Sequence, residues 1–245
     1  MFLGEELMPA AFEKVNEFLY RLDIPFDHLY TAVFLVLDEE PILIDSATTQ
    51  ADVRDKILPA LAAMGIDGGK HLVTHRHGDH SGGTPFLLAA RPLFKQITLK
   101  AGASLGNLEA IPLGGHTEDS MGYLDRRTGT LLCGDAFQFY GVGKYGCGIA
   151  DAAMYESTLT RACELPICSI IPSHDFIGGG LAATGKEEVD AFLISAREKW
   201  EEIKAFVLSF PTDDDPFSVV AAWKERYPTL PPLPSMTVRS IRKNI

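Results

Sequence analysis

The stretch His75-Arg76-His77-Gly78-Asp79-His80 places three histidines and one aspartate within six residues. It follows His71-Leu72-Val73-Thr74, which predicts a β-strand. A loop that leaves a strand can aim some of these side chains at one metal ion and the others at a second ion close by. Imidazole and carboxylate together suit zinc, iron or manganese better than calcium or magnesium. The stretch therefore predicts a transition-metal site.

Three later segments carry the same residue types at predicted strand ends. They are Gly114-Gly115-His116-Thr117, Cys133-Gly134-Asp135-Ala136 and Pro172-Ser173-His174-Asp175. Glycine allows the backbone to come close to a metal centre. A single HxH pair at a strand end is usually not a ligand pair, but four such segments together favour one shared metal centre.

The order of these motifs resembles the metallo-β-lactamase-fold superfamily, whose pattern is HxHxDH, then H, then D, then H. The resemblance covers roughly residues 31–180 and implies two metal ions. Its ligand set is His75, His77 and His116 for one ion, Asp79, His80 and His174 for the other, and Asp135 as a bridge between them. Asp45 matches the family's upstream acidic position and would orient ligands by hydrogen bonds, and we expect the same of Asp175.

The resemblance implies an α/β (α+β) fold, a four-layer αβ/βα sandwich in which two sheets face each other and helices cover the outsides. The expected elements agree with this order. A hairpin is expected over residues 29–37 and 41–45, an amphipathic helix between Thr49 and Gly65, a short helix over 84–90, and a helix followed by a strand over 151–171. We expect residues 1–184 to form the metallohydrolase core.

Residues 185–245 are expected to form a C-terminal helical extension packed on that core. Thr184 and Glu187 resemble a capping box, followed by a long helix with one apolar stripe. A second helix should begin at Asp215-Pro216 and end near Arg226, and the prolines after it predict extended chain. Appended helices of this kind could also join subunits into a homo-oligomer.

The expected function is a metal-dependent hydrolase of a small carbonyl substrate: a lactone, a thioester or another carboxylic ester. The nucleophile would be a metal-bridging hydroxide, with zinc as the first choice and iron or manganese as alternatives. Asp79 would pass a proton to the leaving group. Tyr140 and Tyr145 lie in the loop after Asp135 and could donate to an oxyanion, although both could equally be packing residues. Cys147, in a Gly-rich loop, is the rival nucleophile.

Residues at particular positions distinguish the enzyme subtypes of this family from one another. True β-lactamases of the family have Cys or Ser where Asp135 stands, whereas glyoxalase II thioesterases and lactonases have Asp. Glyoxalase II proteins commonly continue with Pro-Gly-His after Gly-His-Thr, but this chain has Glu118-Asp119-Ser120, which argues against a glutathione thioester.

A rival from another reaction class is a persulfide dioxygenase-like oxidoreductase, with one iron held by His75, His116 and Asp135. A binding module without activity would have lost a ligand position, and none is lost. His28 and His71 match no motif and are expected to be structural.

The composition indicates which kinds of binding partner to expect. The chain of 245 residues has 22 basic and 33 acidic residues, a formal net charge of −11, which argues against nucleic-acid binding. No uncharged stretch reaches 18 residues, and the first residues lack the basic and apolar regions of a signal peptide, so we expect a cytoplasmic protein with a small-molecule substrate and no membrane contact. The four cysteines lack CxxC spacing and are expected to be free thiols.

Overall fold

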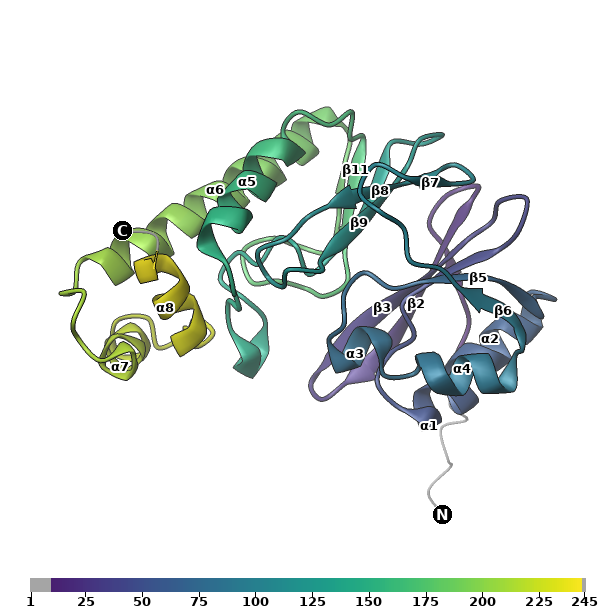
Figure 1. The fold of residues 1–245 in the computed structure, drawn as a ribbon, viewed down its shortest axis with the longest axis horizontal. Coiled ribbons are helices and arrows are strands. Elements are labelled where there is room, and N and C mark those ends of the chain that lie inside the picture. The colour runs from purple at the N-terminus through teal and green to yellow at the C-terminus, as the bar shows by residue number, and fades with distance from the viewer. Residues whose placement is uncertain (1–9, 244–245) are drawn as a thin grey trace, which may run out of the picture. The chain divides into compact units, whose positions relative to one another are not determined.

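The computed structural model describes residues 10–243 and divides the chain into two compact units, residues 1–98 and 99–245. Each unit has one six-stranded mixed sheet with helices packed on it (Figure 1). Within residues 10–243, none of the helices combines the length and the apolar character that crossing a bilayer requires.

The first unit contains a sheet whose strands follow one another in chain order. Its elements are β1 (Glu13–Lys14), β2 (Leu19–Phe26), β3 (Leu29–Val36), β4 (Ile42–Ile44), α1 (Gln50–Asp52), α2 (Leu58–Ala63), β5 (Gly68–Leu72), α3 (Gly78–Ser81), α4 (Thr84–Ala90) and β6 (Leu93–Gln96). The strands from β1 to β4 pair antiparallel, so the expected hairpin is confirmed, and β5 and β6 extend the sheet in parallel.

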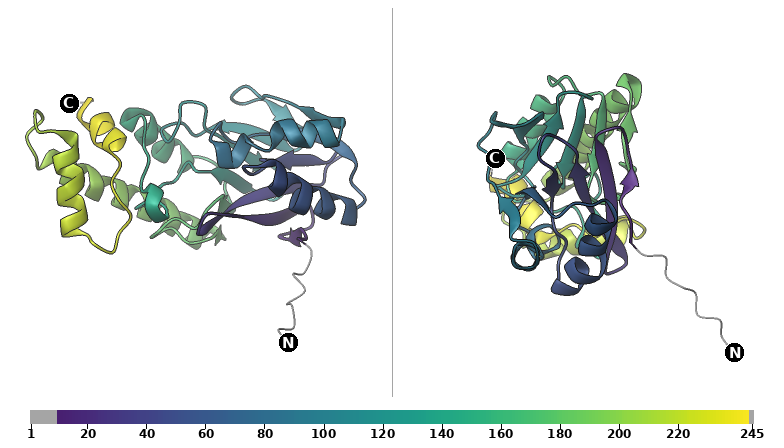
Figure 2. Two further views of the ribbon diagram at one scale, coloured as in Figure 1. Left: turned by 90° about the horizontal axis from the view of Figure 1, so that it is seen from below. Right: turned by 90° about the vertical axis from the view of Figure 1, so that its right-hand side faces the viewer.

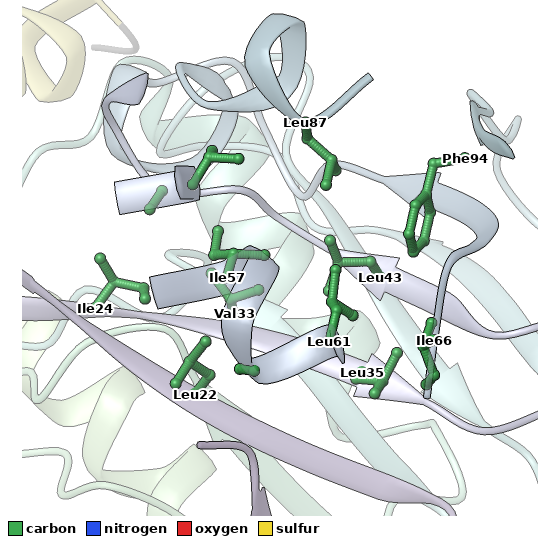
Figure 3. Close-up of a cluster of buried hydrophobic side chains, with 13 residues drawn as sticks. Leu22, Ile24, Val33, Leu35, Leu43, Ile57, Leu61, Ile66, Leu87 and Phe94 are labelled. Carbon is green, nitrogen blue, oxygen red and sulfur yellow. The ribbon is translucent and has the colours of Figure 1, made fainter. Parts of the chain in front are cut away.

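The core of this unit lies between the sheet and its helices. Strand β3 is buried from Thr31 to Val36, the continuous apolar pattern of a strand covered on both faces. Figure 3 shows apolar side chains from β2, β3 and β4 meeting side chains of the helical segment over residues 50–63 and of α4. Examples from the strands and the helices are Leu22, Val33, Leu43, Ile57, Leu61 and Leu87.

The helical segment after β4 begins at the expected capping box. Thr49 accepts from the backbone N–H of Asp52, and the Asp52 side chain accepts from the backbone N–H of Thr49. Between α1 and α2 the chain makes one π-helical turn, Val53–Ile57, just before Pro59, which has no N–H to continue the regular ladder. Gly65, with φ of 71°, follows the end of the segment as expected.

The second unit contains a sheet in the order β12-β11-β10-β9-β8-β7. Its elements are β7 (Ser104–Leu105), β8 (Leu108–Pro112), β9 (Met121–Asp125), β10 (Thr130–Gly134), α5 (Ala152–Ala162), β11 (Ser169–Pro172), β12 (Ala183–Thr184), α6 (Lys186–Leu208), α7 (Pro216–Arg226) and α8 (Ser235–Lys243). Strands β10 and β11 are parallel, and the other neighbours are antiparallel.

The C-terminal helices confirm two expectations and correct two others. The apolar stripe of α6 is buried, and Asp215 caps α7. The expected capping box is wrong, because Thr184 pairs with Ser169 in the sheet and α6 begins after Gly185. Residues 235–243 were not expected to be helical, but they form α8, which lies beside α7 (Figure 2) and also contacts α5 and α6.

Candidate metal centre

Parallel strands bring the first group of candidate ligands to one edge of the first sheet. Asp45 directly follows β4, and the stretch that begins at His75 follows β5 after two residues. Because β4 and β5 are parallel, their carboxyl ends lie at the same edge, which is where open α/β sheets commonly bind ligands. Four candidate side chains, those of His75, His77, Asp79 and His80, therefore gather there.

These four side chains are close enough to share metal ions. The Nε2 atom of His75 lies 3.0 Å from the Nδ1 atom of His77. The rings of His75 and His80 have centroids 4.1 Å apart. The Nε2 atom of His80 lies 3.4 Å from a carboxylate oxygen of Asp79. We call this group the first cluster.

Asp45 lies in hydrogen-bond contact with one member of the first cluster, His80. Its carboxylate is fully buried and accepts from the backbone N–H of Thr74 at 2.7 Å and the Thr74 hydroxyl at 2.8 Å. The same carboxylate lies 2.8 Å from Nδ1 of His80. With a proton on Nδ1, the lone pair of the His80 ring is on Nε2. Metal-binding histidines commonly have this tautomer fixed by a carboxylate that does not itself bind the metal. Thr74 was missed by the sequence analysis, since nothing in its spacing marks it.

Asp45→Asn should lower the free energy of unfolding by about 1–3 kcal/mol, because the amide cannot accept from all three donors and at least one becomes unsatisfied. The backbone is not the cause, since Asp45 has φ of 63° and Asn tolerates this region as well as Asp does. Urea unfolding of the metal-free protein measures the effect. Asp213→Asn, at an exposed position, is the control and should change stability by less than about 0.5 kcal/mol. Equal stability of wild type and Asp45→Asn would contradict the role of Asp45.

Strand ends also gather the candidate ligands of the second unit. Asp135 directly follows β10, and His174 follows β11 after one residue. His116 follows β8, which is antiparallel to β9 as β9 is to β10, so β8 and β10 run in the same direction. All three side chains therefore lie at the carboxyl ends of strands of like direction.

The carboxylate of Asp135 stands between the two histidines of this second cluster. One of its oxygens lies 3.4 Å from Nε2 of His174, and the other lies 3.7 Å from Nε2 of His116. All three side chains are buried. The Nδ1 atom of His116 lies 2.6 Å from the backbone oxygen of Gly148, so this ring also presents Nε2 to Asp135.

Comparison with known proteins gives relatives by sequence. No family model matches the chain. It is 28% identical over 163 residues to the lactamase-like protein adaB of Aspergillus niger, an alignment covering 60% of this chain and 50% of adaB. It is 32% identical over 127 residues to a hydroxyacylglutathione hydrolase of Francisella tularensis subsp. holarctica, covering 45% of this chain and 50% of the hydrolase. The chain therefore spans about half the length of these curated relatives.

Comparison of structures decides the fold. A metallo-β-lactamase from Erythrobacter litoralis matches with a TM-score of 0.59 and 21% identity, over 81% of this chain and 99% of that one. This chain has the metallo-β-lactamase fold. The rubredoxin oxygen:oxidoreductase of Desulfovibrio gigas matches with a TM-score of 0.58 and 17% identity, over 78% of this chain and 61% of that one. A metallo-β-lactamase and an oxidoreductase match almost equally well, so the fold alone does not select the reaction.

The other candidate residues differ in their environments. The hydroxyl of Tyr140 donates to Glu202 of α6 at 2.5 Å, and burial together with this bond raises the pKa of the phenol. Tyr145 has 44% of its surface exposed, and its phenol is the more accessible of the two. His174 is buried while its neighbour Asp175 is exposed.

The two histidines outside the motifs lie in different environments. His71 is fully buried between the Leu43 carbonyl and the Thr84 hydroxyl, and burial lowers its pKa, so it stays neutral. His28 is exposed beside Asp27. The four cysteines are free thiols, as expected.

The donor sets of both clusters fit divalent transition metals. Each cluster combines imidazole nitrogens with a carboxylate, the ligand types that zinc, iron and manganese accept. His80 and His116 are each held at Nδ1 by an oxygen, which fixes Nε2 as the ligand atom. His75 and His80 of the first cluster are buried, as are all three side chains of the second, and metal ions are the partners that such buried groups commonly have.

Proposed function

We propose that this chain is a metal-dependent hydrolase of small carbonyl substrates: lactones, thioesters or other carboxylic esters. The observation that carries the proposal is the gathering of His and Asp side chains at the carboxyl ends of strands in both units, in the motif order of the superfamily. The first cluster would supply His75, His77, Asp79 and His80 to a centre of two ions, and the second would supply His116, Asp135 and His174.

The sequence relatives support hydrolysis. The adaB protein is described as lactamase-like, and the Francisella protein hydrolyses hydroxyacylglutathione by its name. Asp135 stands where the lactonases and thioesterases of the superfamily have Asp. Zinc is the first choice of metal, and a bound divalent ion lowers the pKa of its water toward about 7, which supplies a nucleophile at neutral pH.

The side chains of this chain would then orient the ligands and move the proton. Asp45 and the Gly148 carbonyl hold His80 and His116 at Nδ1, so that both rings keep one tautomer during turnover. Asp79 is only partly buried, and Thr31 donates to one of its oxygens at 3.3 Å. A carboxylate that is both accessible and oriented suits proton transfer to a leaving group. Tyr145 would contact the substrate oxygen, and Tyr140 would do so only by leaving Glu202.

The test uses the full chain, purified with and without added zinc, iron or manganese. We expect elemental analysis to find up to two ions per chain, and a panel of lactones, thioesters and carboxylic esters to be hydrolysed only by the metal-loaded protein. Loss of turnover with a chelator and its return with metal would support the proposal. Oxygen consumption with a persulfide substrate, in place of ester hydrolysis, would replace it by the iron-dependent dioxygenase reaction.

Cys147→Ser should change kcat by less than about threefold, because the thiol is too basic to act as a nucleophile. Cys147 is buried, and burial raises the pKa of its thiol to about 12. Steady-state kinetics and mass spectrometry of the protein during turnover measure the effect. Abolished activity in this variant, or an acyl group trapped on Cys147, would mean that the hydrolysis proceeds through a thioester on the protein.

A further inference from the structure

The segment of residues 147–151 wraps around His116. The backbone N–H groups of Ala150 and Asp151 donate to the carbonyl of Gly115, at 2.8 and 3.0 Å. The carbonyl of Gly148 accepts from Nδ1 of His116 at 2.6 Å. The orientation of the His116 ring therefore depends on where this segment holds the Gly148 carbonyl.

A threonine of the last helix holds the two peptide groups on either side of the Gly148 Cα, one of which contains that carbonyl. The hydroxyl of Thr237, in α8, donates to the carbonyl of Cys147 at 2.6 Å and accepts from the N–H of Ile149 at 2.9 Å. Thr237 is fully buried. Its one donor and one of its two acceptor lone pairs are thus used on the residues immediately before and after Gly148.

Gln138 ties the same segment to the carboxylate residue of the cluster. Its side-chain oxygen accepts from the N–H of Gly148 at 3.0 Å, and its side-chain nitrogen donates to the carbonyl of Asp135 at 2.8 Å. Gln138 is nearly completely buried. The backbone of Asp135 and the ring of His116 are therefore connected through Gly148.

The chain before α8 also lies directly against this loop. A Cβ atom on Gly146 would meet the carbonyl oxygen of Pro232 at 1.9 Å, and Gly146 has φ of 74°. Only glycine allows this approach. Two parts of the C-terminal region, Pro232 and Thr237, thus fix residues 146–149 from outside.

We propose that Thr237 is a positioning residue, which sets the orientation of the His116 imidazole from α8 through the peptides on either side of Gly148. The proposal rests on the proposed function only in taking His116 as a metal ligand. Removing the hydroxyl leaves the Cys147 carbonyl and the Ile149 N–H buried without their partner, so the segment must shift to recover hydrogen bonds. The Gly148 carbonyl moves with it, and the imidazole loses a fixed acceptor at Nδ1.

The test compares Thr237→Val, which has the same shape without the hydroxyl, with Thr237→Ser, which keeps it. The first readout needs no metal: the ¹⁵N chemical shifts of His116 report which ring nitrogen carries the proton. We expect a protonated Nδ1 in the wild type and in Thr237→Ser, and a mixture of tautomers in Thr237→Val. The second readout is zinc affinity by competition with a chelator, where Thr237→Val should bind 10–100-fold more weakly, the usual effect of losing an outer partner.

Arg242→Met is the matched control for a merely structural effect. It also removes hydrogen bonds of α8, from the guanidinium to the carbonyls of Asp214 and Pro211 at 2.6 and 2.8 Å, but these go to the loop after α6 and not to residues 146–149. It should lower the melting temperature while leaving the His116 shifts and zinc affinity unchanged. If Thr237→Val does not fold, Thr237→Cys replaces it, since a thiol is a weaker donor and acceptor of similar size.

The outcomes separate the two proposals. Wild-type shifts and zinc affinity in Thr237→Val, or in Thr237→Cys where it replaces the valine variant, would overturn the role of Thr237 while leaving the hydrolase proposal intact. A wild-type protein that binds no zinc, iron or manganese would overturn the proposed function, and the tautomer measurement on the metal-free protein would still decide whether Thr237 orients His116.

Discussion

Asp135→Ala should remove tight metal binding from both ion positions at once. In the second unit its two carboxylate oxygens face different imidazoles, at 3.4 Å from His174 and 3.7 Å from His116. A carboxylate in this position can be shared between two ions, and no other proposed ligand has that role. Losing a residue that only hydrogen-bonds a metal ligand typically lowers metal affinity by about 10–100-fold. We expect a larger fall in metal affinity for Asp135→Ala, with hydrolysis lost in parallel.

Elemental analysis after dialysis measures the metal content of the Asp135 variant. His28→Ala is the control. His28 is exposed, its ring lies beside Asp27, and it belongs to neither cluster, so the metal content of this variant should equal that of the wild type. Two tightly held ions in Asp135→Ala would show that Asp135 does not bridge them. One retained ion would assign Asp135 to a single position.

Asp79→Asn should lower kcat at least 10²-fold, the usual contribution of general acid–base catalysis. The amide keeps the size of the side chain and can still accept from Thr31, which lies 3.3 Å away in the wild type, but it cannot take up and return a proton. Steady-state kinetics on the best substrate of the panel provides the measurement.

Part of this loss would come from displaced metal, because Asp79 is also a proposed ligand beside His80. Metal content is therefore determined on the same samples, and kcat is expressed per loaded chain. Asp213→Asn, which changes an exposed carboxylate between α6 and α7, should keep wild-type kcat. A kcat per loaded chain within threefold of wild type in Asp79→Asn would rule out Asp79 as the proton shuttle.

Much of the fold follows from patterns that are local in the sequence. The hairpin of β3 and β4, the capping box at Thr49, the stripe of α6 and the cap at Asp215 were all expected, because each depends on residues within a few positions of one another. Helix α8 was not expected, since the prolines before it suggested extended chain. Its buried residues pack on distant parts of the second unit. This burial stabilises a short helix that the local sequence does not predict.

The sequence by itself determined the chemistry of the site: which histidines and aspartates lie at strand ends, and that their order is that of the metallo-β-lactamase-fold superfamily. Only the tertiary structure decided what orients them. Asp45 meets His80 across 35 positions, and Thr237 reaches Cys147 across 90, through hydrogen bonds between segments that no local pattern connects. Such bonds exist because a buried polar group must find a partner, and folding, not spacing along the chain, determines which groups are near enough to serve.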